Sequence, residues 1–533
     1  MTSLSIKFGL AAAAFVCVIC PGRLRAADPP ALDAITAHEE QRQYAKFLPP
    51  LETVALPSEQ AVLAAFLEKM RAPDRTPAVT VAAADEALAK LPSPTSLRGM
   101  IQYARAQALE NLGRDLEAVE ATEESVQLLQ GYSAPLIKAF TLNAYLNRTA
   151  PATDYLMRAI RVDPNTARTI DDYEINNLLR RLQGFHDEAR ARAISDRLLQ
   201  IGWIGNHVGS RSQLAVEAIK LHVANGDIAG ARALVPKLLQ PTDSRELLIM
   251  NAYAQIWPDI ESWAGPRLER QWPIYLAEAR ERWEAGKSTI AARDYLSALF
   301  AVGHYEAAVR EFLPMFDAPA LNDDELIFMV PPLANSLAHL GRWSDADALY
   351  ERAEQTWPLG WRANALNVSA NHALLLLEEG HTEKALKLMD SSLADARRWG
   401  PQVGQTALAR MEHSRACMLH ALGRDVDARV SMTEALAVER GPAAATLHLC
   451  MGSADLAKTT LLHALADEAT REDVVRFMQR PGEAPDPSPY DQKQRAAADA
   501  LRADPELVQA VALYGRILPW QLNDASGKTQ HST

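Results

Sequence analysis

The sequence predicts an all-α fold, an α-solenoid of stacked helix–turn–helix units. Three observations support this: a short motif recurs along most of the chain, each copy lies between two apolar helix-like segments, and a helix-ending residue stands at its centre. The 533 residues are 48% hydrophobic and 23% charged, an ordinary globular composition that excludes disorder throughout.

The recurring motif is clearest in LGRDLEAVEA from Leu112 and LGRWSDADAL from Leu340. Each copy has a Gly or Asn that would end a helix, and we use this residue as an anchor for alignment. The nine anchors are Gly113, Asn147, Gly184, Gly226, Gly303, Gly341, Gly380, Gly423 and Gly452. The residue five positions later is alanine in all nine units: Ala118, Ala152, Ala189, Ala231, Ala308, Ala346, Ala385, Ala428 and Ala457.

Physical chemistry explains these residue types. Glycine or asparagine supplies the left-handed backbone that ends the first helix. Alanine is expected where the second helix crosses the first, because a larger side chain would push the two backbones apart. Pro164 and Pro358, seventeen positions after their anchors, would stop the second helix before it meets the next unit.

The segment Val330–Pro358 gives the best single match to a known repeat, through Ala334, Leu337, Gly341, Ala346, Tyr350, Ala353 and Pro358. It resembles the tetratricopeptide (TPR) family, whose unit is a helix–turn–helix of about 34 residues. Anchor spacings run from 29 to 43, apart from one of 77 that leaves room for a degenerate unit, so the repeats would be divergent. The resemblance covers roughly residues 97–465, and other paired-helix solenoids stay open as an alternative.

Residues 1–27 have the pattern of a secretory signal peptide: Lys7, an apolar stretch Phe8–Cys20, then Pro21-Gly22 and small residues. Thirteen apolar residues are too few to span a bilayer, which takes about 20. A membrane anchor or a buried helix is the alternative. We therefore expect a periplasmic or secreted protein of exported bacterial type, whose mature chain spans no membrane.

Loss of this segment removes Lys7, Arg23 and Arg25, which takes the formal net charge from -12 to -15. Such a charge argues against a general nucleic-acid binder. The predicted organisation follows from these features: residues 1–27 signal peptide, 28–95 N-terminal helical cap, 96–240 repeats, 241–287 degenerate Trp-rich hairpin, 288–470 repeats, and 471–533 linker, capping helices and polar tail.

Motifs for catalysis are absent from the sequence. It contains no GxxxxGK[ST], no GxGxxG after a predicted strand, no HExxH and no GxSxG. We therefore expect a protein that is not an enzyme and that uses neither a cofactor nor a metal.

One cluster keeps a metal alternative open. His413, Cys417 and His420 are spaced to share one helical face, and His448, Cys450 and His463 follow them. Imidazole and thiolate are ligands for zinc or copper. Two other interpretations stay open: Cys417 is a small buried apolar residue, or it forms a disulfide with Cys450.

The TPR resemblance also implies a binding surface, since the first helix of each unit lines a concave groove in that family. Some members grip a peptide carboxylate there with a set of five residues. Asn335, Asn371 and Arg410 match three of those places, whereas Pro331 and Ser414 depart from the other two. Together with His413, these three are the candidate partner-binding residues.

The leading functional hypothesis is a scaffold or adaptor that binds a protein or peptide on its concave surface, in cell-envelope assembly or secretion. The alternative is a glycan-binding protein or an enzyme of polysaccharide metabolism, with its site in the Trp-rich middle around Trp263 and Trp272. All ten tryptophans lie beyond residue 200, and they can be either helix-packing residues or stacking platforms.

Overall fold

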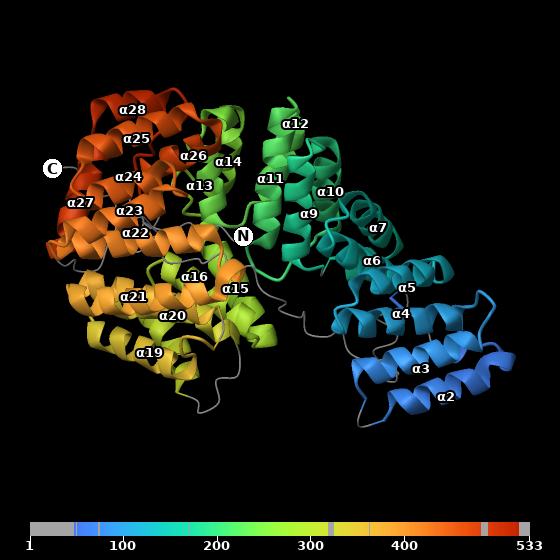
Figure 1. Cartoon of the computed structure of the whole chain (residues 1–533). Helices are drawn as coiled ribbons and strands as arrows, with labels where there is room; N and C mark the ends of the chain where they lie inside the picture. The colour runs from blue at the N-terminus through green and yellow to red at the C-terminus, as the bar shows by residue number, and fades with distance from the viewer. Residues whose placement is uncertain are drawn as a thin grey trace. The chain divides into compact units, whose positions relative to one another are not determined.

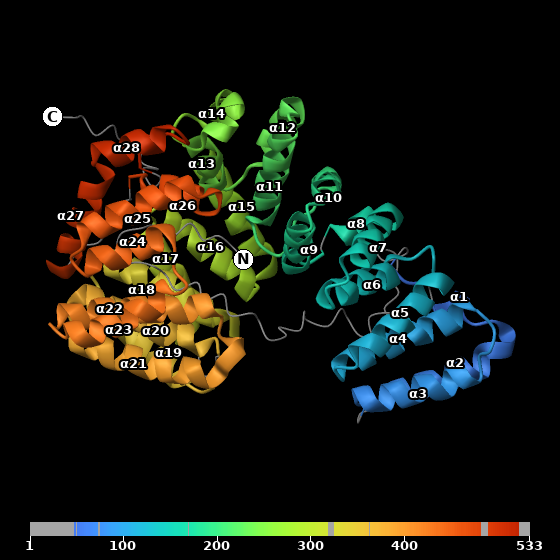
Figure 2. The ribbon, with the colours of Figure 1, turned by 45° about the horizontal axis from the view of Figure 1, so that its top comes forward.

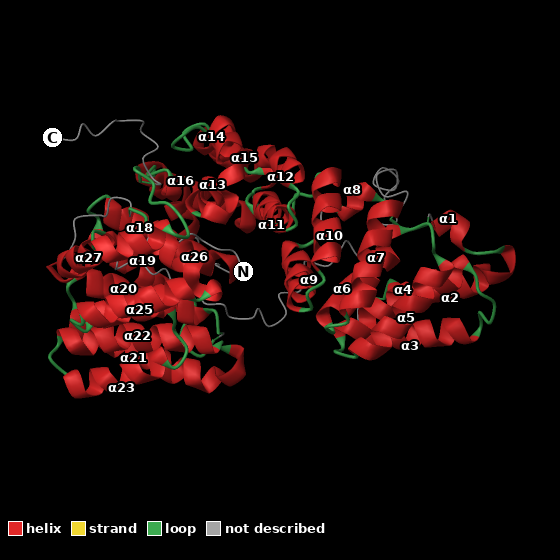
Figure 3. Cartoon of the chain, turned by 90° about the horizontal axis from the view of Figure 1, so that it is seen from above, coloured by secondary structure: helices red, strands yellow, loops and turns green. Residues whose placement is uncertain are grey.

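The computed structural model describes residues 47–49, 51–72, 75–168, 170–317, 324–361, 363–480 and 489–521. The predicted signal peptide (1–27), residues 481–488 of the predicted linker and the end of the chain from 522, with the polar tail, lie outside them. Apart from turns and loops, the described residues form helices and one isolated antiparallel bridge between Met250 and Gly515. This confirms the all-α helical-repeat fold (Figure 3). Among the described helices, none is both long and apolar enough to cross a bilayer.

The chain divides into two compact units between Asn206 and His207. The described helices of the first unit are α1 (Leu51–Val54), η3 (Pro57–Glu59), α2 (Gln60–Met70), α3 (Pro77–Ala89), α4 (Ser96–Asn111), α5 (Asp115–Leu128), α6 (Ser133–Tyr145), α7 (Thr149–Val162), α8 (Pro164–Ala167), α9 (Asp172–Gly184) and α10 (Glu188–Ile201). Antiparallel pairs α4/α5, α6/α7 and α9/α10 follow one another, and α5 also packs on α6 (Figure 2).

The second unit begins at His207. Its helices up to the chain's middle are α11 (Ser210–Ala224), α12 (Ile228–Leu234), η4 (Val235–Lys237), α13 (Pro241–Ile249), η5 (Asn251–Ile256), α14 (Trp257–Ala264), α15 (Gln271–Gly286), α16 (Thr289–Ala301), α17 (Tyr305–Phe312), η6 (Leu313–Phe316) and η7 (Asp324–Met329). The segment 241–287 is therefore helical, and α13 packs on both α14 and α15.

The rest of the second unit is the most regular part of the array. It contains α18 (Val330–His339), α19 (Trp343–Thr356), α20 (Ala365–Glu379), α21 (Thr382–Trp399), η8 (Gly400–Gln402), α22 (Gln405–Ala421), α23 (Asp425–Leu436), α24 (Gly441–Cys450), α25 (Ala454–Ala466), α26 (Glu468–Phe477), α27 (Pro489–Arg502) and α28 (Pro505–Ala512). Each pair from α18/α19 to α24/α25 is a hairpin (Figure 1).

The turns between paired helices have the backbone that the anchors predict. Gly341 has φ of 71°, its N–H bonds to the Ala338 carbonyl at 2.9 Å, and the Arg342 N–H bonds to the Leu337 carbonyl at 2.9 Å. This pair of hydrogen bonds is the Schellman motif. Eight predicted anchors have positive φ: Gly113, Asn147, Gly226, Gly303, Gly341, Gly380, Gly423 and Gly452.

The third anchor was placed two residues too early. Gly184 is the last residue of α9, and His186 takes the left-handed conformation instead, with φ of 56°. Accordingly Ala189 is exposed, and Ala191, five positions after His186, is fully buried. The prediction failed because a glycine can also adopt right-handed helical backbone, so its presence alone does not mark the end of a helix.

The alanines that follow the anchors lie where the paired helices meet. Eight of the nine predicted positions have an exposed fraction of 0%: Ala118, Ala152, Ala231, Ala308, Ala346, Ala385, Ala428 and Ala457. Ala191 completes the set in the corrected register, also at 0%. The close approach of the two helices therefore depends on a methyl-sized side chain at this position.

The second unit closes on itself, because α26 packs beside α13 (Figures 1 and 2). Lys220 of α11 lies 2.5 Å from Glu246 of α13 and 3.6 Å from Glu472 of α26, and Arg476 lies 2.6 Å from Glu472. Burial lowers the pKa of Lys220, but Glu246 and Glu472 outweigh it and raise that pKa above its ordinary value. Opposite charges thus offset the cost of burying each group.

The last residues of the array extend this closure. The Arg516 N–H bonds to the Ile249 carbonyl at 2.9 Å, and the Arg516 guanidinium lies 3.8 Å from the centre of the Trp257 ring. A Cβ on Gly515 would stand 2.3 Å from the Ile249 carbonyl oxygen, so the approach requires glycine. The C-terminal segment, predicted to contain capping helices, thus also packs on Ile249 and Trp257 of the second unit.

The corrected register of α10 gives a matched pair of substitutions. Ala191→Leu forces extra volume between α9 and α10 and is expected to lower the free energy of unfolding by about 1–3 kcal/mol. Ala189→Leu, on the exposed side of the same helix, should stay within about 0.5 kcal/mol of wild type. Urea unfolding followed by circular dichroism measures both. Equal effects would contradict the packing role of Ala191.

Candidate functional site

The four candidate partner-binding residues lie on the first helices of successive hairpins. Asn335 is on α18, Asn371 on α20, and Arg410 and His413 on α22; α18 packs on α20, and α20 on α22. Asn335, Arg410 and His413 are half-buried, whereas only 6% of Asn371 is exposed. The Asn371 amide donates to the Asn367 carbonyl at 2.6 Å, within its own helix. Partner binding through these four residues stays a prediction.

Helix α20 is enclosed by its neighbours. It is buried at every position from Ala365 to Glu378 except Leu374. Helices α18, α19, α21, α22 and α27 and the turn η7 all pack against it. The position of Asn371 therefore belongs to a closed interior, and the expectation that α20 lines an open groove is wrong for this part of the array.

Helix α27 covers part of this face, since it packs on α20, α24 and α25 (Figure 1). Its buried residues recur at helical spacing. They are Asp491, Gln494, Ala498 and Leu501, and the half-buried Tyr490 packs against the core that α20, α21 and α22 share. Lys493, Ala496 and Asp499 on its other side are exposed. The chain thus binds α27, one of its own helices, on the surface that the first helices of its hairpins form, which we call the first-helix face.

Carboxyl groups are buried in this contact. Burial and the neighbouring Asp491 raise the pKa of Glu378 well above its ordinary range, and Arg495 acts against them. Burial also raises the pKa of Asp491, to about 6, again opposed by Arg495. At neutral pH the docked helix therefore keeps a costly carboxylate in the interface.

A histidine on the other side of α20 holds that helix to its neighbour. The His372 ring lies 2.8 Å from Glu354 and 2.6 Å from Asp347, both of α19, and it stacks on Tyr350 with centroids 5.0 Å apart. Burial lowers the pKa of His372, but Glu354 and Asp347 outweigh it and raise the pKa. Sequence reasoning missed this group, because its partners are eighteen and twenty-five positions away.

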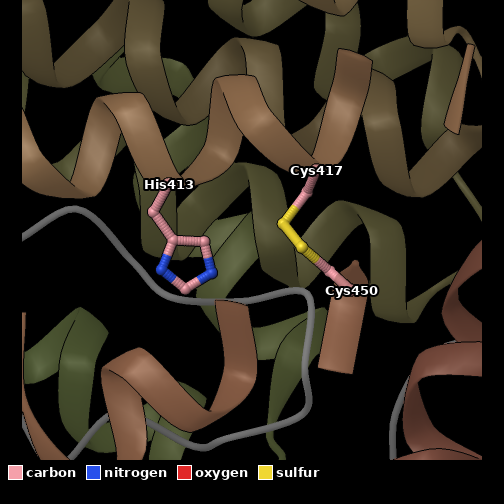
Figure 4. A group of neighbouring side chains, drawn as sticks. All are labelled: His413, Cys417 and Cys450. Carbon is pink, nitrogen blue, oxygen red and sulfur yellow. A yellow bond between two sulfur atoms is a disulfide. The ribbon is translucent and has the colours of Figure 1, made fainter. Parts of the chain in front are cut away.

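A second cluster lies where His413 and Cys417 of α22 meet Cys450 of α24 (Figure 4). Cys417 and Cys450 form a disulfide between α22 and α24, with Cα atoms 5.5 Å apart. Among the alternatives for Cys417, the structure thus shows the disulfide. The His413 Nδ1 atom lies 2.8 Å from the carboxylate of Glu439, which is 4% exposed. His420, expected beside them, instead bonds to Asp425 at 2.7 Å.

The positions of the tryptophans favour a role in helix packing over a role as exposed stacking platforms. Trp272 is 3% exposed and meets Tyr275 edge-on, and Trp203 and Trp357 are among the largest buried side chains. Trp263 is 36% exposed, yet its indole N–H donates to the Leu238 carbonyl at 3.0 Å. Of the two tryptophans on which the glycan hypothesis centred, Trp272 is thus withdrawn from solvent.

The disulfide joins residues 33 positions apart, so its removal should increase the freedom of the unfolded chain. We expect the double substitution Cys417→Ser with Cys450→Ser to lower the free energy of unfolding by about 3–4 kcal/mol. Unfolding curves in urea, compared with wild type before and after reduction, measure this loss. Two reactive thiols in an unreduced, denatured chain that lacks residues 1–27, and with them Cys17 and Cys20, would contradict the pairing.

The raised pKa of Asp491 predicts a pH dependence. The folded carboxyl keeps its proton up to about pH 6, whereas the unfolded group loses it near 3.8. The stability from this group is therefore full below pH 3.8 and lost as pH rises through about 6. Asp491→Asn should stabilise the chain at pH 7 by about 2–3 kcal/mol and much less at pH 4.

Urea unfolding at pH 4 and pH 7 tests this expectation. Lys493→Gln, on the exposed side of the same helix, is the control and should change neither value by more than about 0.5 kcal/mol. If Asp491→Asn lowers the free energy of unfolding equally at pH 4 and pH 7, the ionised Asp491 carboxylate does not destabilise the wild-type chain.

Comparison with known proteins gives no family. No family model and no curated protein matches the chain. Solved structures with similar helical chains include yeast Tom70, 14% identical over 85% of this chain and 99% of that chain, with a TM-score of 0.32. The TPR domain of P58(IPK) is 12% identical over 67% and 98%, with a TM-score of 0.19. Naa15/Naa10 bound to HypK-THB is 13% identical over 76% and 67%, with a TM-score of 0.25.

Proposed function

We propose that this chain is an exported helical-repeat scaffold that binds a protein or peptide partner during cell-envelope assembly or secretion. The pattern of residues 1–27 supports export. Arrays of helical hairpins offer extended surfaces made of many small contacts, which suits a peptide or a helix better than a small molecule. The sequence also lacks the motifs of common enzymes.

One observation carries the proposal: the first-helix face of the array already holds a helix. Helix α27 lies on α20 and α24, and its buried positions Asp491, Gln494, Ala498 and Leu501 repeat at intervals of three or four. Recognition of an amphipathic helix by such spacing is a general binding mode. The face that binds α27 is therefore suited to a partner helix of the same pattern.

The contact with α27 is imperfect, which favours exchange. The Gln494 Oε1 and Arg495 Nε atoms are buried without a hydrogen-bond partner. A polar atom in this state costs about 1–3 kcal/mol. A partner helix with apolar side chains at these two positions would avoid that cost, so we propose that it competes with α27 for this face.

A peptide that copies residues 489–502 tests the face directly. Ala498 of α27 is fully buried, so Ala498→Asp in the full chain should release α27 from its site. The labelled peptide should then bind to the Ala498→Asp chain at least about tenfold more tightly than to wild type, where α27 competes with it. Fluorescence anisotropy measures both affinities.

Two controls define the outcome. The same peptide carrying Ala498→Asp should bind neither chain, and Asp499→Asn in the full chain should leave the face occupied. If the peptide binds neither chain although circular dichroism shows both to be folded, the first-helix face is not a helix-binding surface. If the peptide binds as expected, a pull-down from envelope extract with the Ala498→Asp chain identifies the natural partner.

A further inference from the structure

The structure also brings together three metal-ligand side chains that the proposed function does not use. One nitrogen of His413 and the sulfur atoms of Cys417 and Cys450 all lie within 4.8 Å of one another. His413 and Cys417 come from α22, one helical turn apart, and Cys450 is the last residue of α24. Tetrahedral zinc with ligand bonds of about 2.0–2.3 Å holds its ligand atoms about 3.3–3.8 Å apart.

In the disulfide state these sulfur atoms are poor ligands, because it is the thiolate that binds a metal. We propose that reduction of the Cys417–Cys450 disulfide converts this cluster into a zinc site with His413, Cys417 and Cys450 as ligands. A dithiol reductant supplies two electrons and two protons and becomes a disulfide, or a phosphine reacts with water and becomes its oxide, and the S–S bond breaks to give two thiols. Zinc then displaces the two thiol protons, which pass to solvent.

The surroundings of His413 favour metal binding through one particular nitrogen. The Glu439 carboxylate lies 2.8 Å from Nδ1 and accepts a hydrogen bond from it, so Nε2 is the nitrogen left to bind a metal. In Figure 4 the ring nitrogen farther from the point of attachment is on the side of the disulfide. A carboxylate that orients a histidine in this way is the usual second partner of a zinc ligand.

The remaining surroundings are apolar and close-packed. Ala416, Ala435 and Leu447 form a buried cluster with the two cysteines, and Met432 and Leu436 pack against it. The exposed fractions of Cys417 and Cys450 are 5% and 6%, whereas the His413 side chain is 19% exposed. A small ion would therefore enter beside His413, and the fourth coordination position is left to water.

Two separate elements would thus be joined in either redox state. The disulfide joins α22 to α24 covalently, and zinc would hold the same two helices through three ligands after reduction. The inference is tested by zinc binding alone, so its outcome does not depend on whether a partner helix binds the face that α27 covers.

Equilibrium dialysis of the full mature chain against micromolar zinc tests the proposal. With a phosphine reductant present, about one zinc ion per chain is expected, and less than about a tenth of that without it. In the reduced state, His413→Ala should weaken zinc binding by at least about 100-fold, and Glu439→Gln by about 10–100-fold.

His420→Ala is the matched control, since His420 lies on the same helix and bonds to Asp425 instead. It should leave zinc binding unchanged, and circular dichroism should show all variants to be equally helical. The proposal fails if the reduced chain retains less than a tenth of an equivalent, or if the oxidised chain binds zinc as tightly as the reduced one. It also fails if His413→Ala and His420→Ala weaken binding equally.

Discussion

The close approach of two helices at a fully buried alanine is the contact on which the rest of this structure depends. In every hairpin from α4/α5 to α24/α25 that carries an anchor, a left-handed turn reverses the chain and an alanine five positions later lies against the first helix. The methyl group sets the distance between the helix axes. Where neighbouring hairpins stack, as from α18/α19 to α24/α25, this distance also affects how the faces of their first helices are presented.

The same stacking explains why the candidate groove is filled in the second unit. Helix α20 has neighbours on every side. The Asn371 amide bonds within the helix and the His372 ring bonds to a neighbouring hairpin, whereas the side-chain amide of Asn367 and the hydroxyl of Ser369 are buried without a hydrogen-bond partner. The helix that completes this enclosure, α27, contributes buried polar groups as well as apolar ones. The contact holds α27 on the array, but burial of its polar groups costs free energy of desolvation. Because of this cost, exchange of α27 for a partner helix is feasible.

The cysteine cluster shows how the repeat places chemistry without a dedicated motif. Cys417 lies in the middle of a first helix and Cys450 at the end of the next one, so stacking alone brings the sulfur atoms together. Glu439 reaches His413 from the loop between the hairpins. Three elements of ordinary helical packing thus create one group of convergent donors, whose chemistry depends on the redox state of two sulfur atoms.

The sequence by itself determined the fold class and eight of the nine anchors, because helix-ending glycines and crossing alanines are local requirements of a hairpin. It also singled out His413, Cys417 and His420, with Cys450 in the next unit, but it could not choose between ligand, disulfide and packing. Only the tertiary structure decided that choice, the register at His186, and the burial of Asn371. Each depends on which helices lie side by side, and residues far apart in the chain, such as Glu378 and Asp491, come together only when the array has folded.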